Sequence, residues 1–159
     1  MIIALLAGRR FPQDIAFSWL EAHGRRFMGQ HNLWRLGATP GTEEAILERL
    51  INAGEHVQVY LPYTVDFHQQ SSRELISILK RAGKVEECRI KDYAYGSGFV
   101  KRNMMMLSGA GLFIAFYDDR EGALKKTIEK ARNHNKQIMV IGPDQNQSFK
   151  YLKIRDVCK

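Results

Sequence analysis

The chain has 159 residues, which suits a single domain. Of these residues 45% are hydrophobic, which is enough to form a full core without stabilising disulfide bonds or metal ions. No run of 18 or more apolar residues occurs, so we expect no membrane span. The formal net charge of +7 favours anionic partners such as nucleotides, nucleic acid or acidic proteins. Solvated, lysine-rich helix exteriors would also explain this charge.

The cysteine and histidine content predicts no metal site. The cysteines are Cys88 and Cys158, and neither they nor the histidines have the spacing of metal ligands. We therefore expect a reduced, cytoplasmic protein without a metal or cofactor. Residues 1–8 are apolar but too short for a signal peptide, and no basic segment precedes them, so we interpret them as a first buried strand.

Apolar runs alternate with helical periods along the chain. Residues 2–7 form a continuous apolar run, which is typical of a buried parallel strand. The pattern then predicts helix 13–24, strand 32–36, turn 37–41, helix 42–53, strand 56–61, helix 72–82, strand 84–90, loop 91–98, helix 99–107, strand 112–117, helix 122–133, strand 137–141 and an edge strand near 151–157. This alternation predicts an α/β, Rossmann-like, three-layer fold with a mostly parallel central sheet. We expect one domain, with a core of about 2–142 and a tail of 143–159.

The first candidate ligand-binding segment is Gly8-Arg9-Arg10, directly after the first strand. A glycine there lets the backbone approach a ligand, and an arginine can bind a phosphate or carboxylate through two parallel hydrogen bonds. The same residues also fit an ordinary turn with solvated arginines.

The second candidate segment lies between the second strand and its helix. Gly37, Thr39 and Gly41 form the turn, and Thr42 can cap a helix whose free N–H groups would bind an anion. Glu43 has three possible roles: it stabilises the helix dipole, binds a ribose hydroxyl, or acts as a catalytic acid or base. A plain capped helix is the alternative.

The third candidate segment is Arg102-Asn103, near the start of a helix. Arg102 would reach the crevice at the strand ends. Residues 104–106 are methionines, which we expect to pack in the core and not to form a ligand site.

The fourth candidate segment follows the strand at 112–117. Asp118 and Asp119 could bind ribose hydroxyls, and Gly122 precedes a helix. A solvated acidic loop is the alternative. Nearby aromatic and glycine residues could stack on a base or simply cover the sheet edge: Tyr93, Tyr95, Gly96, Gly98 and Phe99.

Common catalytic motifs are missing from the sequence. It has no Walker A motif, no complete GxGxxG and no nucleophile elbow around Ser97. ATP hydrolysis and ordinary NAD-dependent dehydrogenation therefore lack support.

Taken in order, these segments resemble the SLOG superfamily, the Rossmann-like group of YpsA-like proteins, DprA-like proteins and LOG phosphoribohydrolases. Gly8-Arg9-Arg10 is similar to the Gly-Ser-Arg or Gly-His-Arg turn after the first strand of small SLOG proteins. Residues 37–43 occupy the place of their glycine-rich segment, and Arg102-Asn103 with Met106 resembles their Arg-Asn-x-x-Met helix start. The resemblance covers about residues 2–142 and is stronger in the second half.

The sequence also departs from the family pattern. Ala38 replaces the second glycine of a double glycine, and Pro40 stands where arginine is common. The LOG signature Pro-Gly-Gly-x-Gly-Thr-x-x-Glu is only echoed by residues 40–44, and too early in the chain, so the resemblance does not extend to LOG-type hydrolysis.

The resemblance implies a nucleotide or nucleotide-derived ligand. Our first hypothesis is a binding protein that senses or sequesters such a molecule. The phosphate would be held by Arg9, Arg10, Gly37, Gly41, Thr42 and Arg102, and the ribose by Glu43, Asp118 or Asp119. The first alternative is an N-glycosidase or ribosyltransferase in which Glu43 stabilises an oxocarbenium-like sugar or activates water. The second is a single-stranded nucleic-acid binder, and self-association into a dimer or tetramer is also expected.

Overall fold

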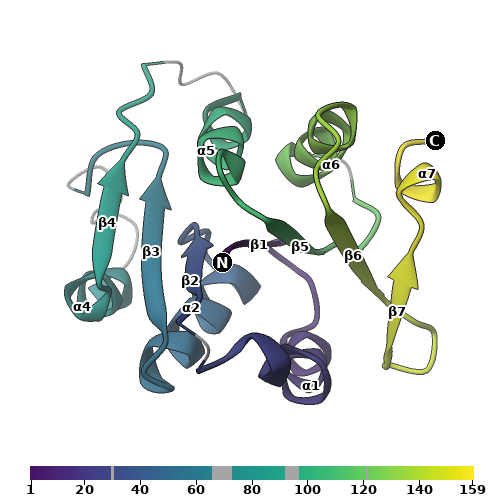
Figure 1. Ribbon diagram of the computed structural model, residues 1–159, viewed down its shortest axis with the longest axis horizontal. Helices are drawn as coiled ribbons and strands as arrows, with labels where there is room; N and C mark the ends of the chain where they lie inside the picture. Colours follow the sequence, from purple (N-terminus) through teal and green to yellow (C-terminus); the bar gives the residue numbers. More distant parts are fainter. Residues whose placement is uncertain (30, 66–72, 92–96, 121) are drawn as a thin grey trace.

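The computed structural model describes residues 1–29, 31–65, 73–91, 97–120 and 122–159, with backbone alone for 73–76. Its centre is a seven-stranded sheet with the strand order β4-β3-β2-β1-β5-β6-β7 (Figure 1). The strands are β1 Ile2–Ala7, β2 Leu33–Leu36, β3 His56–Leu61, β4 Lys84–Glu87, β5 Leu112–Phe116, β6 Ile138–Pro143 and β7 Phe149–Leu152. Neighbouring strands pair in parallel, except that β7 is antiparallel to β6. The predicted α/β, mostly parallel sheet is confirmed.

Helices cover both faces of the sheet, which explains why the central strands β1 and β5 are apolar throughout. The helical elements are α1 Gln13–Ala22, the 3₁₀ turn η1 Gly24–Phe27, α2 Thr42–Asn52, α4 Arg73–Arg81, α5 Ser97–Leu107, α6 Ala123–Asn133 and α7 Ile154–Val157. In Figure 1, α1, α2 and α4 lie on one side of the sheet, and α5, α6 and α7 lie on the other. Two buried clusters result. Trp19, Trp34 and Ile46 belong to the first, and Met106, Phe113 and Ile128 to the second.

The order of the strands creates a crevice beside β1. From β1 the chain proceeds outward through β2, β3 and β4, and it then crosses back to place β5 on the other side of β1. The connections after β1 and β5 therefore lead to helices on opposite faces, α1 and α6. Open α/β sheets bind their ligands at such a switch point, outside the carboxyl ends of the strands.

The C-terminal segment differs from the sequence-based expectation. The edge strand starts earlier than predicted, at Phe149, because the Asp144 carboxylate accepts hydrogen bonds from the backbone N–H groups of Asn146 and Ser148 and closes a tight turn after β6. Residues 154–157 form the short helix α7 instead of continuing the strand, and this helix buries Val157.

The N-cap predicted for α2 is also wrong. Thr42 is the first helical residue, and its hydroxyl donates a hydrogen bond to the carbonyl of Phe11 instead of capping its own helix. The side chain thereby joins the start of α2 to the loop between β1 and α1. Gly41 precedes it with φ 106, a left-handed conformation that favours glycine.

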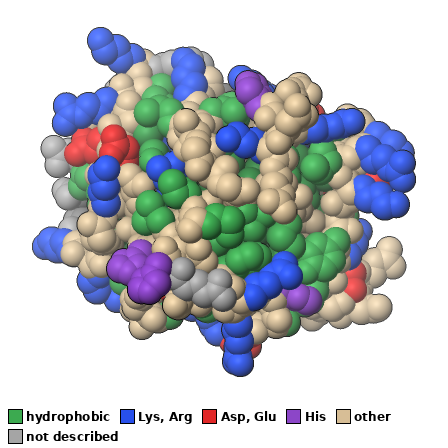
Figure 2. All heavy atoms as spheres, viewed as in Figure 1, with side chains coloured by type: hydrophobic (Ala, Val, Ile, Leu, Met, Phe, Trp, Pro, Cys, Tyr) green, Lys and Arg blue, Asp and Glu red, His purple; other side chains and the backbone are tan. Residues whose placement is uncertain are grey.

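Within the described part of the chain, no helix is long and apolar enough to cross a membrane. On the face shown in Figure 2, lysine and arginine side chains are scattered over the outline and the upper middle, whereas hydrophobic side chains gather in the middle. Charge on this face therefore does not mark a single binding surface, and the site has to be located by geometry.

The central strands should dominate the stability of the fold. Ile114 lies on β5 and is fully buried, so we expect Ile114→Ala to lower the free energy of unfolding by about 2–5 kcal/mol. Met105→Ala is the matched control, because Met105 is 45% exposed and its truncation should change stability by less than about 0.5 kcal/mol. Urea denaturation measures both. Equal destabilisation by the two variants would contradict this account of the core.

Candidate functional site

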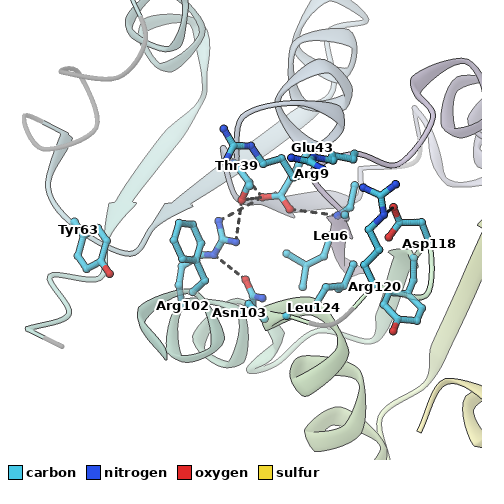
Figure 3. A pocket seen from close by; sticks show the side chains of 17 residues that line it. Leu6, Arg9, Thr39, Glu43, Tyr63, Arg102, Asn103, Asp118, Arg120 and Leu124 are labelled. Carbon is cyan, nitrogen blue, oxygen red and sulfur yellow. Dashed lines mark hydrogen bonds and ion pairs between the residues drawn. The ribbon is translucent and has the colours of Figure 1, made fainter. Parts of the chain in front are cut away.

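A pocket of about 680 Å³ opens at the carboxyl ends of β1 and β5. Tyr63 lies on one side of it and Arg9, Asp118 and Arg120 on the other, with Arg102 between them (Figure 3). Segments far apart in the sequence thus converge on one crevice. Its lining comprises Leu6, Ala7, Gly8, Arg9, Arg10, Thr39, Glu43, Tyr63, Phe99, Arg102, Asn103, Tyr117, Asp118, Arg120, Gly122, Ala123 and Leu124.

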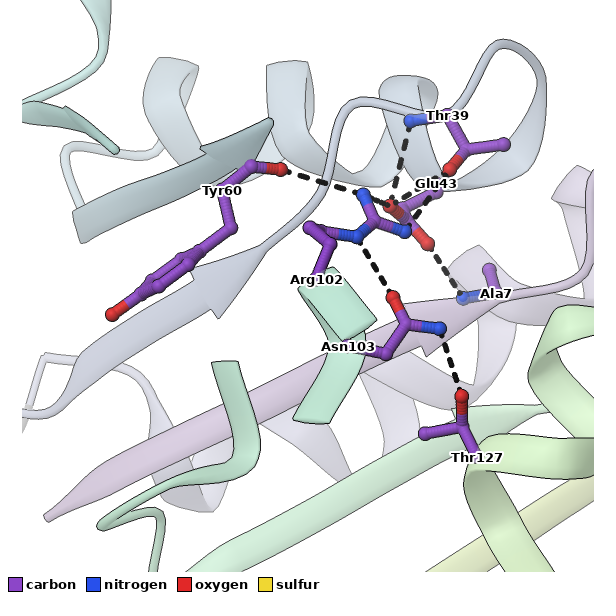
Figure 4. Close-up of polar contacts among 7 residues, drawn as sticks. All are labelled: Ala7, Thr39, Glu43, Tyr60, Arg102, Asn103 and Thr127. Carbon is purple, nitrogen blue, oxygen red and sulfur yellow. Dashed lines mark hydrogen bonds and ion pairs between the residues drawn. The ribbon is translucent and has the colours of Figure 1, made fainter. Parts of the chain in front are cut away.

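A buried ion pair forms the inner wall of this pocket (Figure 4). Arg102 Nη1 lies 3.3 Å from Glu43 Oε1, and both side chains are only 2% exposed. The other carboxylate oxygen, Oε2, accepts a hydrogen bond from the backbone N–H of Ala7 at 3.2 Å. The N–H and hydroxyl of Thr39 donate to Oε1 at 3.4 and 3.3 Å. Glu43 therefore joins the end of β1 and the turn before α2 to the helix α5.

Arg102 directs its guanidinium toward protein acceptors. Besides Glu43, it donates to the carbonyl of Tyr60 at 3.4 Å, to the hydroxyl of Thr39 at 3.4 Å and, through Nε, to Asn103 Oδ1 at 2.8 Å. These acceptors belong to β3, the turn before α2, and α5 itself. Arg102 thus reaches the crevice, as its sequence position predicts, but its nitrogens are occupied by the protein.

Gly37 provides the space for this ion pair. A Cβ atom at position 37 would lie 1.6 Å from Arg102 Nη1 and 2.1 Å from Glu43 Oε1, closer than any real contact. The residue is buried but is not part of the pocket lining. The sequence predicts Gly37 in a ligand-binding turn. The structure gives another reason for a glycine at this position, because any side chain would displace the guanidinium of Arg102.

Asn103 extends the polar network across the pocket to α6. Its amide nitrogen donates to the hydroxyl of Thr127 at 2.9 Å, and that hydroxyl donates to the carbonyl of Ala123 at 2.7 Å. Both side chains are buried. The network holds the first turn of α6 in a fixed position relative to α5.

The outer rim of the pocket carries exposed cations. Arg9 and Arg10 are exposed and line the pocket, as does Arg120, which is 59% exposed and whose Nε lies 3.2 Å from Asp118 Oδ2. The N-terminus of α6 also faces this rim, where Gly122, with φ 145, precedes the helix without a capping side chain. Free helix N–H groups and arginines together favour an anion.

The opposite end of the pocket is aromatic. The rings of Tyr63 and Phe99 meet edge to face with centroids 6.5 Å apart, and Arg102 Cζ lies 5.4 Å from the centroid of Phe99. The remaining members of the predicted aromatic cluster, Tyr93, Tyr95 and Gly96, lie outside the described residues. Gly98 is buried in the first turn of α5.

The structure brings together most of the residues that the sequence singled out. Those on the lining are Gly8, Arg9, Arg10, Thr39, Glu43, Arg102, Asn103, Asp118 and Gly122. Four others are not part of the lining: Gly37, Gly41, Thr42 and Asp119. Asp119 is exposed, and Gly41 packs closely against the carbonyl of Arg9.

Sequence reasoning missed Tyr63 and did not select Arg120. Tyr63 directly follows Pro62 at the end of β3, and this position at a strand end would have been the signal for it. Arg120 stands between the acids and Gly122, in a segment whose predicted ligand-binding residues are Asp118, Asp119 and Gly122.

Thiol and metal chemistry find no support in the described residues. Burial raises the pKa of the Cys88 thiol above its usual value, which disfavours the reactive thiolate at neutral pH. Across the described ranges, no three His, Cys, Asp or Glu side chains lie close enough together to hold a metal ion.

Comparison with known proteins establishes the fold. No family model and no curated protein matches the chain. DNA processing protein A (DprA) from Helicobacter pylori, known from a structure that describes its single-stranded DNA binding mode, is similar with a TM-score of 0.71 at 16% identity. The alignment covers 93% of this chain and 68% of that protein.

DprA from Streptococcus pneumoniae is similar with a TM-score of 0.65 at 14% identity, over 87% of this chain and 49% of that protein. This chain thus corresponds to about half of the pneumococcal protein. At such identities the likeness shows a DprA-like, Rossmann-type fold, whereas function depends on the residues of the site.

Breaking the buried ion pair should destabilise the protein strongly. Glu43→Gln leaves the charge of Arg102 buried without its counterion, so we expect the free energy of unfolding to fall by about 3–5 kcal/mol. Adding Arg102→Met to this variant removes the stranded charge and should restore part of the stability. Denaturation of the single and double variants forms a double-mutant cycle.

Glu21→Gln is the control, because Glu21 forms an exposed ion pair with Arg49, whose removal should cost less than about 1 kcal/mol. Additive effects of Glu43→Gln and Arg102→Met would contradict direct coupling between the two buried charges.

Proposed function

We propose that this chain binds single-stranded nucleic acid, and that one nucleotide of the strand binds in the pocket at the carboxyl ends of β1 and β5. The observation that carries the proposal is the polarity of the pocket, with Tyr63 and Phe99 at one end and exposed arginines at the other (Figure 3). A nucleotide has the same polarity, a flat base at one end and a phosphate at the other. The fold likeness to DprA supports this choice over a purely small-molecule ligand.

The phosphate would lie at the rim. Arg9, Arg10 and Arg120 are exposed there, so their guanidinium groups can reach an incoming phosphate, whereas Arg102 is paired inside the wall. The N-terminus of α6 adds backbone N–H groups to the same side. Contacts with phosphate do not depend on the base sequence of the nucleic acid, and they weaken as the salt concentration rises.

The base would stack at the aromatic end. Phe99 is half-buried beside Tyr63, and Arg102 lies against its ring, which holds the side chain in place. Stacking on an aromatic ring is worth about 1–3 kcal/mol per base and tolerates any base, because every base has a π-face. This arrangement suits an unpaired strand, since a base within a duplex cannot turn out to reach the ring without unstacking.

A free nucleotide is the second candidate ligand. The volume of about 680 Å³ lies within the range of small-molecule sites, and a single nucleotide would occupy the same positions. This is the binding function first expected from the sequence, and it fits membership of the SLOG superfamily, which we also propose.

An N-glycosidase would need Glu43 for chemistry. Its carboxylate lines the pocket but is engaged by Ala7, Thr39 and Arg102, and the residue is 1% exposed. We therefore assign Glu43 a positioning role in this proposal. Catalysis by Glu43 stays a prediction, which base release from nucleoside monophosphates would test.

Removing the rim arginines should weaken binding of a single strand. We expect Arg9→Ala/Arg10→Ala to lower the affinity for a fluorescent single-stranded oligonucleotide and to reduce the slope of log K against log salt by about 1.4, or about 0.7 for each phosphate that is no longer neutralised. Fluorescence anisotropy between low and moderate salt measures both quantities.

The matched control is Arg25→Ala/Arg26→Ala, which removes another exposed pair of adjacent arginines that does not line the pocket. An equal effect of the two double variants would mean that net charge, not the pocket, drives binding. If a mononucleotide displaced the oligonucleotide when both were present at the same concentration, the result would favour a free nucleotide as the ligand. Failure of both ligands to bind a folded protein would refute the proposed site.

A further inference from the structure

Asp118 is an acidic group in a pocket whose rim is otherwise basic. It lies two residues after the end of β5, and its side chain is 11% exposed on the pocket lining. Oδ2 is paired with Arg120 Nε at 3.2 Å, which leaves Oδ1 on the side of Gly8. Glu43, the other pocket carboxylate among the described residues, is enclosed by protein donors instead.

The space in front of Oδ1 is kept open by Gly8. A Cβ atom at position 8 would lie 3.4 Å from Asp118 Oδ1 and 3.6 Å from the carbonyl of Phe116, so a side chain would fill this space. The N–H of Gly8 donates to that carbonyl at 2.8 Å, which keeps the ends of β1 and β5 together. A ligand atom can therefore approach the carboxylate at the switch point of the sheet.

The chemistry of a carboxylate restricts what this atom can be. An ionised carboxylate only accepts hydrogen bonds and repels phosphate, so it receives a hydrogen-bond donor, which is either a sugar hydroxyl or an N–H group of a base. We place the base at the aromatic end of the pocket, which leaves the sugar for Asp118. Within a nucleic-acid strand the 3′-oxygen is esterified and carries no proton. The 2′-hydroxyl of ribose is the sugar donor that remains, and it is the group by which a protein distinguishes RNA from DNA.

We propose that Asp118 binds the 2′-hydroxyl of the nucleotide in the pocket, so that the protein prefers ribonucleotide over deoxyribonucleotide strands. This inference rests on the proposed function, because it assumes that the pocket holds a nucleotide. It goes beyond that function by naming the sugar and the residue that selects it.

The test compares oligouridylate with oligodeoxyuridylate, each of about 12 nucleotides, since the two strands differ only in the 2′-hydroxyl. We expect the unmodified protein to bind the ribose strand at least about tenfold more tightly, as a hydrogen bond to a charged group would provide. In Asp118→Ala the ratio of the two affinities should fall close to one. The ratio is the informative quantity, because removing a negative charge raises the affinity for both strands alike.

Two further variants make the test specific. Asp119→Gly removes the neighbouring charge, which is exposed and not on the pocket lining, at a position whose φ of 63 suits glycine, and it should keep the preference. Gly8→Ala places a methyl group in contact with Oδ1 and should reduce the preference while leaving the carboxylate in place. Thermal unfolding checks that each variant is folded.

The outcomes separate the two proposals. Equal binding of both strands by the unmodified protein, or a preference that survives Asp118→Ala, overturns the sugar assignment and leaves the nucleotide site standing. Binding of neither strand refutes the nucleic-acid function itself.

Discussion

The buried ion pair between Glu43 and Arg102 is the interaction on which the pocket depends. Two charges that are almost fully removed from water are tolerated only when hydrogen bonds satisfy them, and here backbone and side-chain groups from β1, β3, α5 and the turn before α2 do so. Because these partners come from separate parts of the chain, the pair fixes their relative positions. The absence of a side chain at Gly37 is a condition for it, since even a methyl group would occupy the space of the guanidinium.

This arrangement separates the charges that are paired inside the protein from the charges that are exposed to a ligand. Arg102 and Glu43 neutralise each other inside the wall, whereas Arg9, Arg10 and Arg120 are exposed at the rim. A ligand would therefore meet a tightly bonded inner surface and an outer set of cations that face solvent. In such a site the wall determines the shape that is accepted, and the rim supplies the salt-dependent part of the affinity.

Much of the fold could be predicted from the sequence, because apolar runs flanked by glycine and proline identify buried parallel strands without knowledge of their neighbours. Convergence of the loops after β1 and β5 also follows from the strand-end rule. The partners of individual side chains could not be predicted. Arg102 is read as a ligand-binding cation because its acceptor, Glu43, lies 59 residues away, and nothing local reveals the pairing. Thr42 is of a residue type that commonly caps helices, but its hydroxyl donates a hydrogen bond to the carbonyl of Phe11 instead.

Similarity in fold does not by itself determine which ligand this chain binds. At 16% identity the similarity to DprA concerns the backbone fold. The fold determines that loops lie at the strand ends, but it does not determine which side chains those loops carry. In our proposal the specificity comes from the side chains at those strand ends, above all Asp118 beside Gly8. In the proposed complex, a carboxylate at that point would oppose phosphate and accept a hydroxyl, so it would orient the nucleotide as well as select it. The sugar would lie against the sheet, the phosphate would lie outward toward the arginines, and the base would meet Phe99.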